Sequence, residues 1–137
     1  YEPGKIEAVG YRGGKKVASE TIRTAGKAHR VKLELEKGFG EGDLFYIDAK
    51  ITDKKGNFVP IACNDLKFSV KGAGEILAVD AGDPPCLTPF HSDGIKAFNG
   101  LASVIIKATP GRRGKIVVTV TSDGLKNGRV KISRRSI

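Results

Sequence analysis

The chain has 137 residues, 18 glycines, no tryptophan, no methionine and a formal net charge of +9 at pH 7. This length supports one domain with its own hydrophobic core, without metal or disulfide staples. No run of about eighteen apolar residues occurs, which excludes a membrane-spanning helix, and the absence of an initiator methionine and of a leader pattern suggests a fragment or processed product with no signal peptide in this segment.

The first elements in chain order form a predicted β-hairpin. Two β-prone runs, 5–12 and 15–23, flank Gly13-Gly14, where both turn positions can take positive φ. Residues 24–28 then read as a short linker.

Strict alternation of apolar and polar residues predicts several of the remaining strands. In 30–37, Val31, Leu33 and Leu35 alternate with charged residues, which places one face on a core and the other in water. Alternating or apolar runs predict further strands over 45–52, 66–71, 76–79, 101–107, 116–121 and 129–133.

Turn signals separate these runs. The loop 38–43 precedes 45–52, and Asp53-Lys54-Lys55-Gly56-Asn57 follows it as a turn, because Asp, Asn and Gly favour turns for local reasons. Phe58-Val59 begins a short return strand that Pro60 limits. The core is expected to contain Phe45, Phe58 and Phe68, and residues from Arg134 onward are expected to fray.

These elements predict an all-β fold. No segment shows a helical period over ten residues, and seven or more short strands with regular turn signals favour an antiparallel β-sandwich of immunoglobulin type. The cysteine–tryptophan–cysteine pattern of antibody domains is absent, so a bacterial-type Ig-like sandwich fits better. A closed barrel is the structural alternative.

The positive charge favours an anionic partner such as nucleic acid, acidic polysaccharide or anionic lipid. The basic residues, however, stand singly or in pairs, mostly at turns or on the polar side of strands. No helix gathers them on one face, and no aromatic-basic ladder for base stacking occurs. The sequence therefore predicts no nucleic-acid partner.

Chemistry-bearing residues are sparse. The carboxylates Glu7, Glu20, Asp48, Asp80 and Asp83 have no spacing that pairs them for glycoside hydrolysis, and no G-x-S-x-G elbow occurs.

A metal site is not predicted either. His91 with Cys86 and Asp93 makes only a thin metal-ligand cluster on one loop, and neither Asp-rich turn has the oxygen spacing of a calcium loop. Cys63 and Cys86 are expected to be separate, part-buried thiols. No catalytic residue, metal or cofactor is predicted.

The longest loop carries the candidate binding site. Gly82-Asp83-Pro84-Pro85 breaks the strand before it, and the chain turns at Asn99-Gly100 into the next strand. Sugar recognition on a β-sandwich uses aromatic rings with polar groups that fix hydroxyls. The predicted glycan-binding residues are Asp83, Phe90, His91, Phe98 and Asn99. The alternative is that both phenylalanine rings plug the end of the sandwich.

The stretch AGDPPCLTPFHSDGIKAFNGLASVIIKAT, followed by GKIVVTVTSDGLKNGRVKI, resembles the C-terminal Ig-like domain of family 2 glycoside hydrolases, the large β-galactosidase-like enzymes common in gut Bacteroidetes. Gly-Asp-Pro at 82–84 and Lys-Ala-Phe-Asn-Gly at 96–100 are its most specific pieces, and the 53–57 turn followed by Val59-Pro60 matches the family's Asp-x-x-Gly-Asn turn. Relatives often carry a Ser-His-Glu-like run before Pro-Phe, where this chain has Cys86-Leu87-Thr88. That departure favours packing over a shared polar site.

The resemblance implies a parent that hydrolyses glycosides, with β-galactosides expected, and an extracytoplasmic location. The family's catalytic glutamate follows an asparagine in an upstream TIM barrel, and no Asn-Glu dipeptide occurs in this chain. The resemblance therefore implies a non-catalytic segment whose partners are the other domains of the same enzyme, with a homo-oligomer or a carbohydrate as further possibilities.

The opening YEPGKIEAVGYRGGKKVASETIRTAG resembles the hairpin that closes the preceding β-sandwich in such enzymes. The expected division is 1–28 for this hairpin and linker and 29–137 for the C-terminal sandwich. A severed hairpin exposes unpaired edges, so we expect it to pack on the last sandwich or to pair with another copy.

Two classes of function follow. The first is an accessory domain that braces the catalytic domain, mediates oligomerisation or shapes the substrate cleft. The second is a free-standing glycan-binding or adhesive module. Burial of Phe90 and Phe98 favours the first, and exposure of both favours the second.

Overall fold

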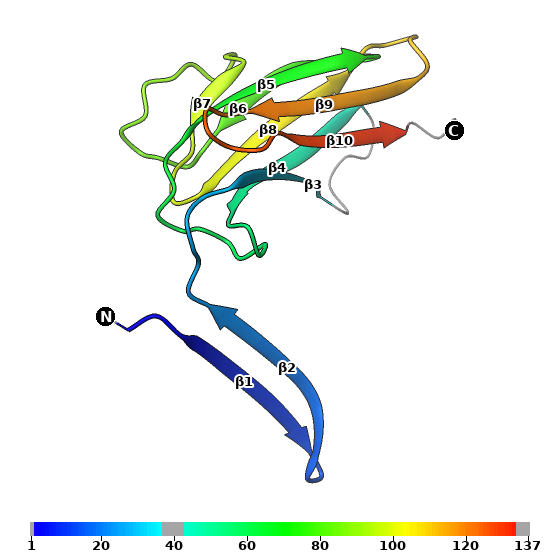
Figure 1. The fold of residues 1–137 in the computed structure, drawn as a ribbon. Helices are drawn as coiled ribbons and strands as arrows, with labels where there is room; N and C mark the ends of the chain where they lie inside the picture. The colour runs from blue at the N-terminus through cyan, green and yellow to red at the C-terminus, as the bar shows by residue number, and fades with distance from the viewer. Residues whose placement is uncertain (1, 37–42, 134–137) are drawn as a thin grey trace.

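The computed structural model describes residues 2–36 and 43–133 and shows two four-stranded sheets stacked face to face, with a two-stranded ribbon extending away from them (Figure 1). The named strands pair antiparallel throughout. Their bounds are β1 Lys5–Arg12, β2 Lys15–Arg23, β3 Arg30–Leu35, β4 Leu44–Thr52, β5 Asp65–Gly72, β6 Gly74–Asp80, β7 Gly94–Lys96, β8 Leu101–Ala108, β9 Lys115–Thr121 and β10 Gly128–Ser133.

The strand order confirms the predicted immunoglobulin-like sandwich. One sheet has the order β3-β4-β8-β6 and the other β10-β9-β5-β7. These correspond to the ABED and GFC sheets of a constant-type immunoglobulin domain, with β7 added at the edge beside β5. The sheets remain separate, so the alternative of a closed barrel is wrong.

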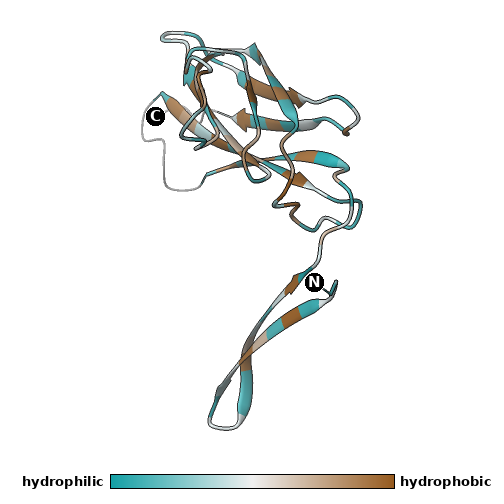
Figure 2. Ribbon diagram, turned by 90° about the vertical axis from the view of Figure 1, so that its left-hand side faces the viewer, coloured by the Kyte–Doolittle hydropathy of each residue, from teal (hydrophilic) through white to brown (hydrophobic). Residues whose placement is uncertain are grey.

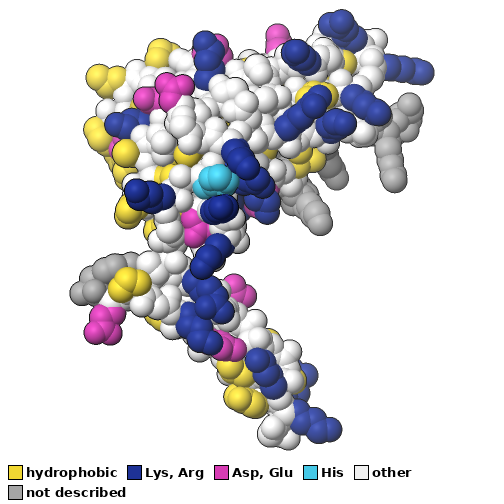
Figure 3. Space-filling model, viewed as in Figure 1, with side chains coloured by type: hydrophobic (Ala, Val, Ile, Leu, Met, Phe, Trp, Pro, Cys, Tyr) yellow, Lys and Arg dark blue, Asp and Glu magenta, His cyan; other side chains and the backbone are white. Residues whose placement is uncertain are grey.

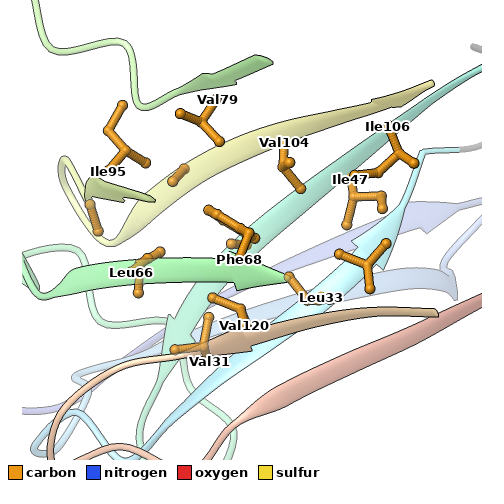
Figure 4. Packing of buried hydrophobic residues seen from close by; sticks show 14 of the residues in the cluster. Val31, Leu33, Ile47, Leu66, Phe68, Val79, Ile95, Val104, Ile106 and Val120 are labelled. Atoms are coloured by element: carbon orange, nitrogen blue, oxygen red, sulfur yellow. The ribbon is translucent and has the colours of Figure 1, made fainter. Parts of the chain in front are cut away.

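The core lies between the sheets and is built by the residues that alternate inward. Figure 4 shows side chains from β3, β4 and β8 meeting those from β5 and β9 across this layer. The largest fully buried side chains are Phe68, Ile47, Ile51, Ile106, Ile116, Val31, Val79, Val104, Val118 and Val120. Apolar and polar residues alternate along the strands (Figure 2), as the period of two predicts.

The β1–β2 hairpin forms where the sequence predicts it, with φ of 56° at Gly13 and 74° at Gly14. Both strands are exposed along their length, apart from the half-buried Val9. The ribbon points away from the sandwich (Figure 1). The expectation that it packs on the last sandwich is therefore wrong, because only the linker and the base of the ribbon reach it. Pairing with another copy stays a prediction.

Other differences from the sequence expectations are local. Phe68 is buried and Phe45 packs partly on the core, but Phe58 is 39% exposed because it lies on the short return after β4 rather than between the sheets. Strand β7 was not predicted, since three residues are too few to show a period. Most of the expected loop 38–43 and the expected frayed end lie outside the described residues.

Candidate functional site

The linker between the ribbon and the sandwich, residues 24–29, is held by hydrogen bonds. We call this linker, together with the turn and return strand beside it at 53–61, the neck. The Thr24 N–H donates to the Gly4 carbonyl, and the Gly4 N–H donates to Thr24 Oγ1, both at 2.9 Å, so the base of the ribbon is closed. Further along, the His29 N–H donates to Thr52 O at 2.8 Å and the Lys126 N–H donates to His29 O at 2.9 Å. The linker is therefore hydrogen-bonded to the base of the ribbon at one end and to the sandwich at the other.

Asp53 joins this linker to the turn that follows β4. Its Oδ1 accepts the backbone N–H groups of Lys55 and Asn57, and its Oδ2 accepts the Gly26 N–H and the Asn57 side-chain amide, at 2.8–2.9 Å. The Asp53 residue is 4% exposed. These bonds, with the Gly26 bond first, hold the pKa of Asp53 well below its ordinary value. The Asp-x-x-Gly-Asn turn thus fixes the chain at the neck as well as forming a local turn.

A groove of about 470 Å³ lies at this neck, between 21–26 of the hairpin and linker and 56–61 of the turn and return strand. Its apolar members include Ile22, which is 68% exposed, and Ile61, which is 87% exposed, together with Phe58 and Pro60. A second, more polar groove of about 980 Å³ shares residues 23–26 and Asn57 with the first. The neck therefore combines hollowed surface with exposed apolar side chains.

Sequence reasoning did not single out Ile22 and Ile61. The signal was present for both: Ile22 faces Ile6 across a ribbon too thin to bury either side chain, and Ile61 follows Pro60 outside any strand. The predicted pairing of the two hairpin strands is enough to place Ile22 opposite Ile6 from the sequence alone.

The long loop holds the predicted glycan-binding residues in two separate places. The Phe90 carbonyl accepts the Val79 N–H at 2.8 Å, and His91 Nδ1 lies 3.0 Å from the Leu77 carbonyl, so this imidazole nitrogen carries the donated hydrogen. Asp83 is half-buried, and its backbone carbonyl accepts the Cys86 N–H in a tight turn. These contacts tie the middle of the loop to β6.

Phe98 and Asn99 belong instead to the turn that enters β8. Phe98 and Leu101 exchange backbone hydrogen bonds around Asn99 and Gly100, whose φ values are 50° and 78°, as in a type I′ turn. Gly100 also bonds to Ala62 O and accepts from the Ile51 N–H. The turn geometry and these backbone hydrogen bonds thus account for Phe-Asn-Gly in the 96–100 motif.

Both predicted aromatic rings are exposed. Phe90 is 64% exposed and Phe98 is 37% exposed. Neither lines the two grooves at the neck. This is the arrangement that the glycan-binding alternative requires, and it does not fit rings that plug the end of the sandwich.

The two cysteines and the His91 cluster do not form a functional site among the described residues. Cys63 and Cys86 are separate thiols as expected, but Cys63 is exposed rather than part-buried, since it follows the return strand at the surface. Among residues 2–36 and 43–133, no group of three His, Cys, Asp or Glu residues is placed to hold a metal ion, His91 with Cys86 and Asp93 included. The same ranges contain no helix that could cross a membrane.

The topology and the neck define the chain as an immunoglobulin-like β-sandwich domain that carries an additional β-ribbon. The sequence profile described as glycoside hydrolase family 2 C-terminal domain 5 matches residues 23–131, and the chain belongs to this family. The resemblance stated from the sequence is thereby confirmed.

Known relatives agree with this assignment. The chain is 36% identical over 140 residues to Beta-galactosidase BoGH2A of Bacteroides ovatus, covering 100% of this chain and 16% of the relative. It is 28% identical over 130 residues to a putative beta-glucuronidase of Formosa agariphila, covering 92% of this chain and 13% of the relative. A solved beta-glycosidase from Bacteroides vulgatus matches with a TM-score of 0.88 at 34% identity, covering 98% of this chain and 18% of that one.

The chain thus spans only 13–18% of the length of these relatives. The match to the solved structure covers the ribbon as well as the sandwich, whereas the family profile begins at the last residue of β2.

Proposed function

We propose that this chain is a non-catalytic accessory domain of a β-galactosidase-like family 2 glycoside hydrolase, and that it docks against the rest of its parent enzyme through the ribbon and the neck. The observation that carries the proposal is the exposed ribbon. Ile6 and Ile22 face each other across it, next to Ala8, and no layer of the described residues covers them. A two-stranded ribbon is marginal in water, so a covering surface would stabilise it.

The proposed division of the chain is 1–28 as the closing hairpin and linker of a preceding sandwich and 29–137 as the C-terminal sandwich. Two observations support it. The family profile starts at residue 23, where β2 ends, and the core cluster draws its buried residues from Val31 onward. The ribbon contributes nothing to that core.

Supporting evidence for a non-catalytic role comes from the titratable groups. Among the described residues, the pKa shifts of Glu34 and Lys50 arise from contacts within their own sheet, and the pKa shift of Asp53 arises from the Gly26 N–H of the linker and from contacts within its turn. The names of the relatives support a glycosidase as the parent. We further propose an extracytoplasmic location and a role in bracing the catalytic domain, shaping its cleft or joining subunits.

The docking role can be tested in the parent enzyme by placing a charge in the neck. Ile22→Asp and Ile61→Asp should each lower the thermal midpoint of the parent and expose the neck to limited proteolysis, because a buried unpaired charge is costly. Leu87→Asp is the matched control, since Leu87 is 95% exposed on the long loop away from the neck. Equal effects at all three positions, or none, would reject docking at the neck.

The exposure of Phe90 and Phe98 favours a second candidate, a glycan-binding module. Affinity electrophoresis with neutral galactans tests it, because stacking of sugar on an exposed ring does not depend on salt. Retention at low and moderate salt that disappears in Phe90→Ala and Phe98→Ala would establish this function. Absence of retention by the unmodified chain would eliminate it.

A further inference from the structure

Charge is distributed unequally over the two outer faces of the sandwich. On the β3-β4-β8-β6 sheet, Glu34 lies between Lys32 and Lys50, with both ammonium groups 2.7 Å from its carboxylate oxygens. On the same face Asp48 accepts the Ser103 hydroxyl at 3.0 Å. Charges of both signs are interspersed on this sheet, and Lys32 and Lys50 both pair with Glu34.

The outer face of the other sheet carries more cations than anions, with Asp65 as the outward carboxylate of β5 at the edge beside β7. The pairing register sets Lys131, Val117 and Lys71 in one row across β10, β9 and β5, and Arg129, Thr119 and Ser69 in the next. We call the basic face the outward residues Lys67, Ser69, Lys71, Lys115, Val117, Thr119, Arg129 and Lys131. Figure 3 shows Lys and Arg side chains gathered over the region of β9 and β10.

These cations lack counter-charges within the described chain. Lys71, Lys115, Arg129 and Lys131 form no ion pair among residues 2–36 and 43–133. Lys67 reaches Asp93 at 3.7 Å, but the two side chains are highly exposed, so that pair is weak.

The spacing of these groups makes the bare face unfavourable. Alternate residues on a strand lie about 7 Å apart, so Arg129 and Lys131 are near neighbours. Lys131 and Lys71 are separated by two strand spacings, about 10 Å. The Debye length at physiological salt is about 8 Å, so these like charges repel one another through incomplete screening. A polyanion laid across the sheet would relieve that repulsion.

The side chains that lie between the cations limit the class of molecule that this face can bind. Ser69, Val117 and Thr119 are small and lie in the centre of the face. Protein interfaces are enriched in aromatic residues and depleted in lysine, which is the opposite of this composition. Base stacking also needs aromatic rings, and the basic face has none. A flat array of lysine and arginine with hydroxyl groups between them suits an anionic sugar chain.

We propose that the basic face binds an acidic polysaccharide, one that carries carboxylate or sulfate groups, along the β10-β9-β5 sheet. This surface shares no residue with the two neck grooves or with the predicted glycan-binding residues of the long loop, so it adds a binding activity to the docking role. The bound chain would contact the cations by charge and the Ser69 and Thr119 hydroxyls by hydrogen bonds. Neutral glycans lack the groups that this face recognises.

The test compares two variants of this chain that lose the same charge. K71Q/R129Q/K131Q removes three cations from the basic face, and K15Q/K54Q/K55Q removes three exposed cations from the tip of the ribbon and the 53–57 turn. The probes are polygalacturonate for carboxylate and dextran sulfate for sulfate, with neutral galactan and duplex DNA alongside. Binding is measured at about 0.15 M salt and as a function of salt.

We expect the unmodified chain to bind at least one of the two acidic polysaccharides more tightly than galactan. The face variant should bind roughly tenfold to a hundredfold more weakly, with a shallower salt dependence, because fewer ionic contacts form and fewer counterions are released. The turn variant should bind nearly as tightly as the unmodified chain.

Several results would overturn the proposal. They are no binding of either acidic polysaccharide, equal weakening in both variants, or tighter binding of duplex DNA than of either polysaccharide. If an acidic protein surface of the parent covers the basic face instead, the face variant alone lowers the thermal midpoint of the parent and the polysaccharides do not bind.

Discussion

The backbone N–H of Gly26 donates a hydrogen bond of 2.8 Å to Asp53 Oδ2, and this bond connects the linker of the ribbon to the turn that follows β4. The same carboxylate closes its own turn through Lys55 and Asn57. One side chain therefore sets both the local turn and the path of the chain into β3. An Asp fits this position because its carboxylate accepts hydrogen bonds from three backbone N–H groups at once, those of Gly26, Lys55 and Asn57.

Replacing this carboxylate by an amide should weaken the neck. Asp53→Asn puts a donor where the site offers only donors, so at least one N–H group loses its acceptor while buried. We expect the thermal midpoint to fall by several degrees, and Asp123→Asn in an exposed turn to change it little. An unchanged midpoint in Asp53→Asn would mean that the neck bonds contribute nothing to stability.

The pH dependence of this effect has a defined sign. The folded-state pKa of Asp53 is depressed below its ordinary value of 3.8, so its contribution to stability is fully present above that pH. It is lost as the pH falls below 3.8 toward the folded-state pKa. The difference in midpoint between the unmodified chain and Asp53→Asn should accordingly shrink in acid, as thermal unfolding at several pH values would show.

Glu34→Gln should have a smaller effect that depends on pH and salt. Hydrogen bonds from Lys32, then from Lys50, lower the pKa of Glu34 from 4.5 to about 2. The depressed pKa means that the stabilisation is present above 4.5 and is lost between 4.5 and about 2. The side chains of Glu34 and Lys50 are 39% and 37% exposed, so solvent screening limits the contribution to about 0.5–1 kcal/mol.

Denaturant unfolding of Glu34→Gln against the unmodified chain, at neutral pH and in acid, measures this difference. High salt should reduce it, because the Debye length at 1 M salt is about 3 Å. Glu20→Gln on the exposed ribbon is the control, since Glu20 has no ion pair among the described residues. A difference that persists at high salt and low pH would show that packing rather than charge is responsible.

Gly100→Ala and Gly124→Ala separate backbone strain from steric collision. Both glycines have positive φ, 78° and 73°. A Cβ at Gly124 meets open space, whereas a Cβ at Gly100 would collide with the Val59 carbonyl oxygen and the Phe58 ring. Gly124→Ala should cost about 1–2 kcal/mol, and Gly100→Ala distinctly more. Equal losses in denaturant unfolding would mean that the return strand moves aside freely.

Most of the sandwich could be predicted because its strands alternate. Val31 and Leu33, like Ile116 and Val118, are buried as the period of two requires. The short strand β7 could not be found this way, and Phe58 was misplaced, because hydrophobicity alone does not tell a return strand at the surface from a strand in the core.

The site was less predictable for a physical reason. The sequence predicts Asn99 as a glycan-binding residue, but its position is set by a turn whose partners, Ala62 and Ile51, are remote in sequence. The basic face was hidden in a similar way, since Lys71 and Lys131 are sixty residues apart and become neighbours only through β9. Residues that the sheet brings together need the strand order, which alternation does not supply.

Phenylalanine truncation gives a final contrast between core and surface. Phe68 is 1% exposed between the sheets and Phe90 is 64% exposed on the long loop. Phe68→Ala should cost about 3–5 kcal/mol, because it removes buried apolar area and leaves a cavity. Phe90→Ala should cost about 0.5 kcal/mol or less. Denaturant unfolding of both variants measures the pair, and a large loss from Phe90→Ala would assign that ring to packing and take away the main argument for a sugar platform on the long loop.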